Sequence, residues 1–206
     1  MTDSIGDVNA DGWNHNNHYH NLLLDAVPPG CRRALDVGCG LGTFARRIAA
    51  RAGHVDALDE NEAVIQQARE TSRGSERISF IHEDFMTWTA GEPYDVISMI
   101  AVLHHLPFRH ALEKAATLLR PGGVLTVLGL HRARSFAHMG ARSLVGYPVS
   151  AFYRITRPTS RVGAPVRDPS MTLAEISREA GALLPAATIR RHLLWRYSLI
   201  WVKPQT

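Results

Sequence analysis

Cysteine and long apolar runs are what this sequence most clearly lacks. Only two cysteines, Cys31 and Cys39, occur among its 206 residues. Two cysteines are too few for a disulfide framework, so we expect a reducing, cytoplasmic environment. No stretch approaches the roughly 18 consecutive apolar residues of a membrane-spanning helix. Residues 1–4 show neither the basic start nor the apolar core of a secretory signal, so we expect none.

Negative charge is scarce in the last part of the chain. Residues 1–130 contain 11 Lys and Arg against 16 Asp and Glu, a net charge of −5, whereas residues 131–206 contain 12 against 3, a net charge of +9. No acidic residue occurs between His131 and Asp168, a stretch that contains seven arginines. Such a basic surface suits an anionic substrate, a nucleic acid or a lipid headgroup, and equally a solvated arginine-rich face.

Glycine is concentrated at one informative point. In residues 33–44 a short apolar strand leads into Gly38, Gly40 and Gly42 and then directly into a helix. Glycine has no Cβ and lets a ligand approach the backbone, while the helix N-terminus presents N–H groups to that ligand. The spacing differs from the G-x-G-x-x-G order of a dinucleotide fingerprint. Because Asp36 would repel a pyrophosphate, we expect a zwitterionic or cationic ligand.

A carboxylate follows this turn at the distance that ribose recognition requires. Residues 54–59 form the second expected strand, and Asp59 stands at its carboxyl end. Asp59 lies about twenty residues after the glycines, the usual separation for a carboxylate that binds ribose hydroxyls. The first βαβ unit is therefore predicted to bind a nucleoside, and not through phosphate groups.

The remaining chain alternates between expected strands and expected helices. This alternation predicts an α/β fold with a doubly wound, mostly parallel sheet and helices on both faces. Thr172 is expected to cap a helix that runs to about Ala180, with Glu175 completing a capping box. The other expected strands are 77–82, 94–100, 124–130, 187–194 and 196–202, and the other expected helices are 42–52, 60–72 and 107–119.

Several segments occur in an order that characterises one family. After the glycine turn and Asp59 come Glu83-Asp84-Phe85, the strand 94–100, the run Val-Leu-His-His-Leu at 102–106 and the turn Leu-Arg-Pro-Gly-Gly-Val-Leu at 119–125. This set resembles the class I S-adenosylmethionine (SAM)-dependent methyltransferases. The resemblance implies a Rossmann-like, seven-stranded sheet with an antiparallel last strand and a helical insertion after strand five. It also implies SAM as cofactor and S-adenosylhomocysteine (SAH) as product.

The resemblance assigns roles at the methionine end of SAM. Gly38 and Gly40 would let the backbone approach the methionine part, and Asp36 would orient its ammonium group. Ile100 or Ala101 would offer backbone groups at the same end. The alternative role for Asp36 is to cap the N-terminal turn of the helix that follows.

The resemblance also assigns roles at the adenosine end. Asp59 would bind the ribose hydroxyls, with Glu60 or Asn61 beside the adenine. Asp84 would meet the edge of the adenine, and Phe85 its face.

Residues 1–30 are expected to cover the cofactor, ahead of a single SAM-binding domain at 31–206. The segment 13–20 is rich in Asn, His and aromatic residues, and His18 and Tyr19 are the candidates for contact with the methionyl carboxylate. The alternative is a capping helix with ordinary polar residues. The histidines of this segment lack the carboxylate or cysteine partners of a dedicated zinc site, so no metal is expected.

Three histidines follow strands four and five, where the methyl acceptor is expected. Methyl transfer from SAM is an in-line displacement that depends on alignment, and a general base is optional. Either His104 or His105 is a candidate base or acceptor clamp, while the other packs under the turn. His131 is a further candidate base.

The expected activity is methyl transfer to a small-molecule acceptor, apolar or anionic, of the natural-product kind. Residues 131–170 are expected to form a substrate lid around the apolar stretch 139–153. The alternatives are an RNA or protein methyltransferase that uses the basic half, and a SAM-binding protein at a membrane surface. An Asn/Asp-Pro-Pro-aromatic motif is absent at 100–103, which disfavours methylation of exocyclic base nitrogens and makes a nucleic-acid partner unexpected. The glycine spacing disfavours an NAD-linked oxidoreductase.

Overall fold

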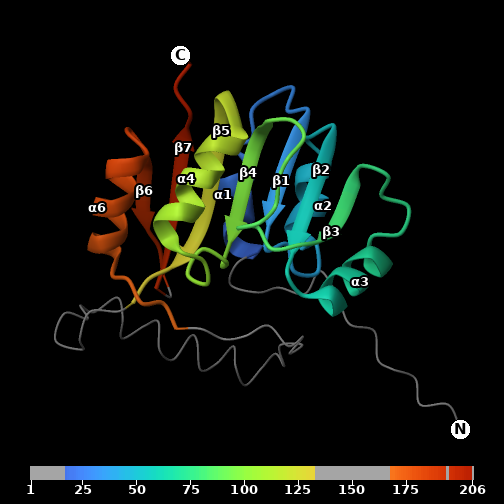
Figure 1. Cartoon of the computed structure of the whole chain (residues 1–206), viewed down its shortest axis with the longest axis horizontal. Coiled ribbons are helices and arrows are strands. Elements are labelled where there is room, and N and C mark those ends of the chain that lie inside the picture. The colour runs from blue at the N-terminus through green and yellow to red at the C-terminus, as the bar shows by residue number, and fades with distance from the viewer. Residues whose placement is uncertain (1–16, 133–167, 194, 206) are drawn as a thin grey trace, which may run out of the picture.

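A computed structural model describes residues 17–132, 168–193 and 195–205 of the chain. Seven strands form one sheet in the order β3-β2-β1-β4-β5-β7-β6 (Figure 1). Strands β1 to β5 run parallel to one another, and β7 is antiparallel to both of its neighbours. The expected fold class is thus confirmed. The strands are β1 (Arg33–Val37), β2 (His54–Asp59), β3 (Ile78–His82), β4 (Tyr94–Ile100), β5 (Leu119–Leu130), β6 (Thr188–Arg191) and β7 (Arg196–Val202).

Helices pack on both faces of the sheet. One apolar cluster joins α1, α2 and α3 to one face, and a second joins α4 and α6 to the other. In Figure 1, α1 and α2 lie behind the sheet and α4 lies in front of it. No helix in the described ranges has the length and hydropathy of a membrane span. The helices are η1 (Asn17–Tyr19), α1 (His20–Leu24), α2 (Thr43–Ala49), α3 (Glu62–Thr71), α4 (Phe108–Leu118) and α6 (Leu173–Leu183).

Helix boundaries follow local capping chemistry. Asn61 precedes α3 rather than joining it, because its side chain accepts a hydrogen bond from the backbone N–H of Val64. The capping box expected before α6 is present, with Thr172 and Glu175 each bonded to the other's backbone. The expected lid at 139–153, and most of the insertion at 131–170, lie outside the described residues.

Buried carboxylates fix the amino-terminal edge of the sheet. One oxygen of Asp95 accepts hydrogen bonds from the backbone N–H groups of Arg32 and Arg33, at 2.8 and 2.9 Å. Asp56 pairs with the Arg33 guanidinium at 2.8 Å and accepts the Tyr94 hydroxyl at 2.7 Å. These bonds tie β1, β2 and β4 together at the edge away from the motif residues. The predicted site residues lie at the opposite end of these strands, the carboxyl end.

Candidate functional site

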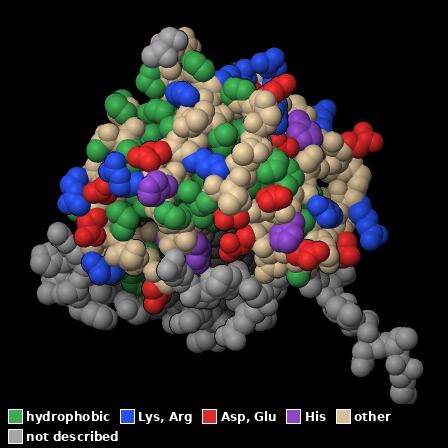
Figure 2. Space-filling model, viewed as in Figure 1, with side chains coloured by type: hydrophobic (Ala, Val, Ile, Leu, Met, Phe, Trp, Pro, Cys, Tyr) green, Lys and Arg blue, Asp and Glu red, His purple; other side chains and the backbone are tan. Residues whose placement is uncertain are grey.

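The carboxyl ends of β1, β2 and β4 lie at one edge of the sheet. This edge is at the bottom of Figure 1, and the space-filling view shows acidic and histidine side chains gathered along it (Figure 2). In register, Asp36 of β1 lies opposite Ser98 of β4 and Ala57 of β2. Ligands of open parallel sheets bind at such an edge, where the strand order reverses. Here the order reverses between β1 and β4.

The glycine turn after β1 has left-handed backbone at three positions. Gly38, Gly40 and Gly42 have φ angles of 65°, 54° and 75°. A Cβ at Gly38 would lie 2.5 Å from the Val102 side chain, and one at Gly42 would lie 2.6 Å from the Phe80 ring. A Cβ at Gly40 would meet no atom within 4 Å among the described residues. Two glycines therefore allow close packing, whereas Gly40 faces open space that a ligand can approach.

Asp59 at the end of β2 is held against this turn. Its Oδ2 accepts the backbone N–H of Gly40 at 3.0 Å, and its Oδ1 accepts that of Asn61 at 3.0 Å. The carboxylate keeps further lone pairs for donors such as ribose hydroxyls. The structure therefore brings together Asp59 and Gly40, two of the predicted site residues, and the contact of Asp59 with ribose stays a prediction. Glu60 beside them is exposed, and the Asn61 side chain caps α3.

Asp36 is a buried carboxyl with one unused oxygen. The side chain is 2 % exposed, and its Oδ1 accepts the Ser98 hydroxyl at 2.6 Å. Its Oδ2 is buried and accepts no hydrogen bond of normal geometry among the described residues, although the backbone N–H of Ala45 in α2 lies close enough to favour the charged form of the carboxyl. Burial, reinforced by the negative charge of Asp59, raises the pKa of Asp36 to about 7. A cation within reach of this carboxyl would satisfy the oxygen and favour its charged form.

The expected ligand fits these observations. The open space at Gly40, the braced carboxylate of Asp59 and the buried oxygen of Asp36 suit the methionine chain, the ribose and the ammonium of SAM, respectively. SAM carries an ammonium group and a sulfonium, and neither conflicts with two carboxyl groups. A pyrophosphate would meet repulsion from the same pair.

The residues expected around the adenine have local partners. One carboxylate oxygen of exposed Asp84 accepts the backbone N–H of Met86 at 2.8 Å. Phe85 is 4 % exposed and packs in the core with the Lys114 ammonium 5.5 Å from its ring centroid. The contacts of Asp84 and Phe85 with adenine stay predictions. At the other end, Ala101 follows β4 with a φ of 54°, an uncommon backbone conformation for alanine.

The N-terminal candidates lie near the turn between β6 and β7. The Tyr19 ring is partly buried, with its centroid 4.7 Å from that of His192, while His18 is exposed. His20 is buried against Phe44 of α2, and burial with the nearby Arg47 charge lowers the pKa of His20 to about 4. Contact between His18 or Tyr19 and SAM stays a prediction, as does the covering role of residues 1–30.

His104 and His105 share the turn after β4. Their ring centroids are 4.0 Å apart, and the Nδ1 of His104 is buried without a hydrogen-bond partner among the described residues. Burial and the neighbouring His105 lower the pKa of His104 to about 4, so its imidazole is neutral at pH 7. A neutral imidazole both donates and accepts a hydrogen bond. His104 is thus equipped to position an acceptor.

His131 follows β5 at the same edge of the sheet. It is 4 % exposed, and its Nδ1 lies 3.2 Å from the Arg132 carbonyl oxygen. Its Nε2 is buried and has no partner in the part of the chain that the structure describes. Burial lowers the pKa of His131. A role as general base for His104, His105 or His131 stays a prediction.

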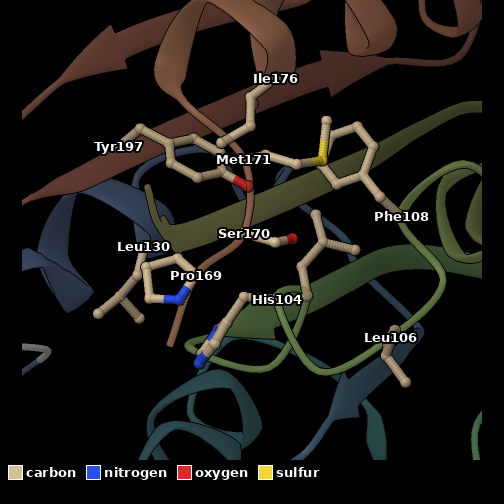
Figure 3. Close-up of a pocket in the computed structure, with 10 residues that line it drawn as sticks. His104, Leu106, Phe108, Leu130, Pro169, Ser170, Met171, Ile176 and Tyr197 are labelled. Atoms are coloured by element: carbon tan, nitrogen blue, oxygen red, sulfur yellow. The ribbon is translucent and has the colours of Figure 1, made fainter. Parts of the chain in front are cut away.

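A small pocket opens beside His104 on the face that α4 and α6 cover. Figure 3 shows its lining, which includes Leu130 of β5, Met171, Ile176 of α6 and Tyr197 of β7. Tyr197 was missed from the sequence because its position depends on how β7 pairs with β5. The one available signal was a glycine inside the apolar run of β5, since such glycines often mark a close approach.

No group of three or more His, Cys, Asp or Glu residues in the described ranges is placed to hold a metal ion.

The chain matches the methyltransferase-domain family over residues 34–123. It is 34 % identical over 197 residues to an uncharacterized methyltransferase of Mycobacterium tuberculosis, covering 93 % of this chain and 98 % of that protein. It is 30 % identical over 166 residues to the ubiquinone biosynthesis O-methyltransferase of Stutzerimonas stutzeri, covering 76 % and 71 %. A trans-aconitate 2-methyltransferase of Methylobacterium radiotolerans is 41 % identical over 110 residues, covering 51 % and 41 %.

Solved structures share the fold. The N-methyltransferase NodS from Bradyrhizobium japonicum, in complex with SAH, superposes with a TM-score of 0.63 at 18 % identity, over 96 % of this chain and 94 % of that one.

Proposed function

This chain belongs to the class I SAM-dependent methyltransferases, and we propose that it methylates a small molecule bound at the carboxyl ends of β4 and β5. The observation that carries the proposal is the position of His104. His104 lines a pocket and has a buried Nδ1 without a hydrogen-bond partner among the described residues, and it belongs to the loop whose Val102 packs on the glycine turn. Two relatives support the acceptor class, since their names refer to ubiquinone biosynthesis and trans-aconitate.

The cofactor side of the site rests on the carboxyl groups of β1 and β2. We propose that buried Asp36 orients the ammonium of SAM through the turn or a water, and that Asp59 accepts ribose hydroxyls while it braces Gly40. When bound, SAM supplies a methyl group on a positively charged sulfur, and the electrons of the broken C–S bond would leave that sulfur as a neutral thioether. The protein's task is then alignment and the exclusion of water, which lower the barrier without a metal.

His104 is proposed as the residue that positions the acceptor. A conjugate-acid pKa of about 4 makes this imidazole a weak proton acceptor at neutral pH. Its neutral ring is suited to orienting an acceptor hydroxyl or carbonyl by a hydrogen bond. His131 and His105 lie at the same edge and remain proposed alternatives for removing the acceptor's proton.

The test uses SAM with a radiolabelled methyl group. The purified chain is incubated with labelled SAM and cell extract, which is then separated into small-molecule, RNA and protein fractions. We expect the label to accumulate in the small-molecule fraction. Label confined to RNA or protein would overturn the proposal in favour of a macromolecular acceptor that uses the basic residues 131–206.

The matched control separates transfer from contamination. Asp59→Ala removes the carboxylate that braces Gly40, whereas Glu70→Ala changes an exposed residue of α3. Labelling must fall with the first variant and persist with the second. Equal labelling by both variants would attribute the activity to another protein.

A further inference from the structure

The pocket beside His104 is small, and both apolar and polar side chains line it. Its volume is about 30 Å³, room for roughly two water molecules where one needs about 10–15 Å³. Leu103, Phe108 and Ile176 form part of its wall. Space of this size admits a short alkyl group or the edge of a ring, with the rest of a molecule outside.

A glycine in β5 makes room for Tyr197, which lines the pocket. Gly129 pairs directly with Tyr197 across the antiparallel β5–β7 ladder. A Cβ at Gly129 would lie 2.3 to 2.5 Å from the ring and hydroxyl of Tyr197. The tyrosine ring therefore lies flat over the glycine, 2 % exposed, with its hydroxyl directed into the pocket (Figure 3). Burial raises the pKa of Tyr197, so the hydroxyl remains a neutral donor.

The polar groups of the lining carry no charge at neutral pH. They are the His104 imidazole, the Ser170 hydroxyl and the Tyr197 hydroxyl, and no Lys, Arg, Asp or Glu is among the described residues that line the pocket. An anion buried here would lose hydration without gaining a countercharge, which is costly. A neutral oxygen would instead find hydrogen-bond partners.

The pocket is physically joined to the cofactor turn. The Val102 side chain packs against the Cα of Gly38, at the place that a Cβ would otherwise occupy. His104 follows two residues later and lines the pocket. A group held in the pocket thus lies next to the loop that contacts the methionine side of the expected cofactor site.

We propose that this pocket holds the uncharged end of the methyl acceptor, an alkyl or aromatic group bearing a hydroxyl or carbonyl oxygen, with His104 and Tyr197 as its positioning residues. The inference rests on the proposed small-molecule function and narrows the acceptor class from apolar or anionic to uncharged at this end. It also makes Tyr197, whose ring fits only because Gly129 has no Cβ, a residue that selects the acceptor.

The test is a binding measurement that needs no knowledge of the natural acceptor. The chain is labelled with ¹³C at methionine methyl groups and saturated with SAH, and phenol is titrated in while the Met171 resonance is followed. That resonance is assigned with Met171→Leu. Phenol is expected to shift it saturably in the millimolar range, whereas benzoate, the same ring with a charge, is expected to bind at least about tenfold more weakly.

Two variants and a control locate the effect. Tyr197→Phe removes only the hydroxyl and is expected to weaken phenol binding about fivefold, the value of one hydrogen bond. Gly129→Ala is expected to abolish binding because the ring must move. Gly91→Ala, where a Cβ meets nothing within 4 Å, is expected to bind as the wild type does.

Three results would overturn the inference: no saturable shift with phenol, equal binding of benzoate, or unchanged binding in Tyr197→Phe. The outcome is independent of the labelling experiment with SAM. Saturable phenol binding together with label only in RNA or protein would overturn the small-molecule function and leave the uncharged pocket established. Label in small molecules without phenol binding would overturn the pocket alone.

Discussion

Replacing Asp36 by asparagine tests the electrostatics of the cofactor site without any ligand. The carboxyl is buried, and its Oδ1 accepts the Ser98 hydroxyl. Asparagine has nearly the same shape, and its carbonyl oxygen can accept the same hydrogen bond. The substitution removes the ionisable group and little else, so its effect on stability should depend on pH.

The sign and size follow from the pKa of Asp36. Burial raises this pKa from 3.8 to about 7, so between these values the folded chain holds a proton that the unfolded chain has released. The free energy of unfolding therefore falls as pH rises through this range and levels off above pH 7. At about 1.4 kcal/mol per pKa unit, the penalty of the ionised Asp36 approaches roughly 4 kcal/mol at most.

Urea unfolding of the cofactor-free chain between pH 5 and pH 8 measures this difference. Asp36→Asn should become more stable than the wild type, with an advantage that grows by up to about 1.4 kcal/mol per pH unit toward pH 7. Glu70→Gln, at an exposed site on α3, should run parallel to the wild type. If the Asp36→Asn curve also runs parallel, Asp36 is not a destabilised buried carboxyl, and the electrostatic reasoning fails.

Three further predictions concern the same edge of the sheet. Asp59→Ala should weaken SAH binding roughly 10- to 100-fold by calorimetry, the range of a charge-assisted hydrogen bond, and an unchanged Kd would remove Asp59 from the ribose site. Gly38→Ala should lower the free energy of unfolding by about 2 kcal/mol or more, because its Cβ meets Val102. Gly40→Ala should cost only about 1 kcal/mol of backbone strain and should mainly reduce the affinity for SAH. Thermal unfolding and calorimetry measure the two effects, and the reverse pattern would contradict the conclusion that Gly40 faces open space. Once an acceptor is identified, His104→Ala should lower kcat/KM about tenfold or more. The wild-type kcat/KM should show no His104-dependent fall between pH 8 and pH 5.5, because the pKa of His104 is about 4. A fall in kcat/KM near pH 6.5 that His104→Ala abolishes would contradict that pKa.

Much of the fold was accessible from local sequence patterns. The bounds of β2, β4 and β7 agree with the predicted ranges 54–59, 94–100 and 196–202, because continuous apolar runs bounded by turn residues identify buried strands well. Helix ends were less predictable. The expected helix 60–72 begins after Asn61, since the asparagine side chain is used as a cap.

Strand β5 shows how tertiary pairing extends an element beyond its local pattern. It was expected at 124–130, but it begins at Leu119, which pairs with Tyr94 before a register irregularity. The Pro-Gly-Gly sequence within this stretch is typical of a turn. The pairing with β4 overrides that preference.

The candidate site divides in the same way. The positions of Asp36, Asp59 and the glycines were predictable because they lie at or directly after the carboxyl ends of β1 and β2, at fixed spacings in one βαβ unit. The Tyr197–Gly129 pair was not, because it depends on the antiparallel register between two strands far apart in the sequence. The neutral state of His104 was equally hidden, since burial in the folded chain sets its pKa.

The central claim is that the carboxyl groups at the ends of β1 and β2 hold a sulfonium cofactor rather than a dinucleotide. Calorimetric titration of the chain, freed of carried-over ligand, with SAH and separately with NAD tests it most directly. The account predicts one SAH bound per chain, with proton release near pH 6 that Asp36→Asn abolishes, and no heat from NAD. Binding of NAD without SAH would contradict it.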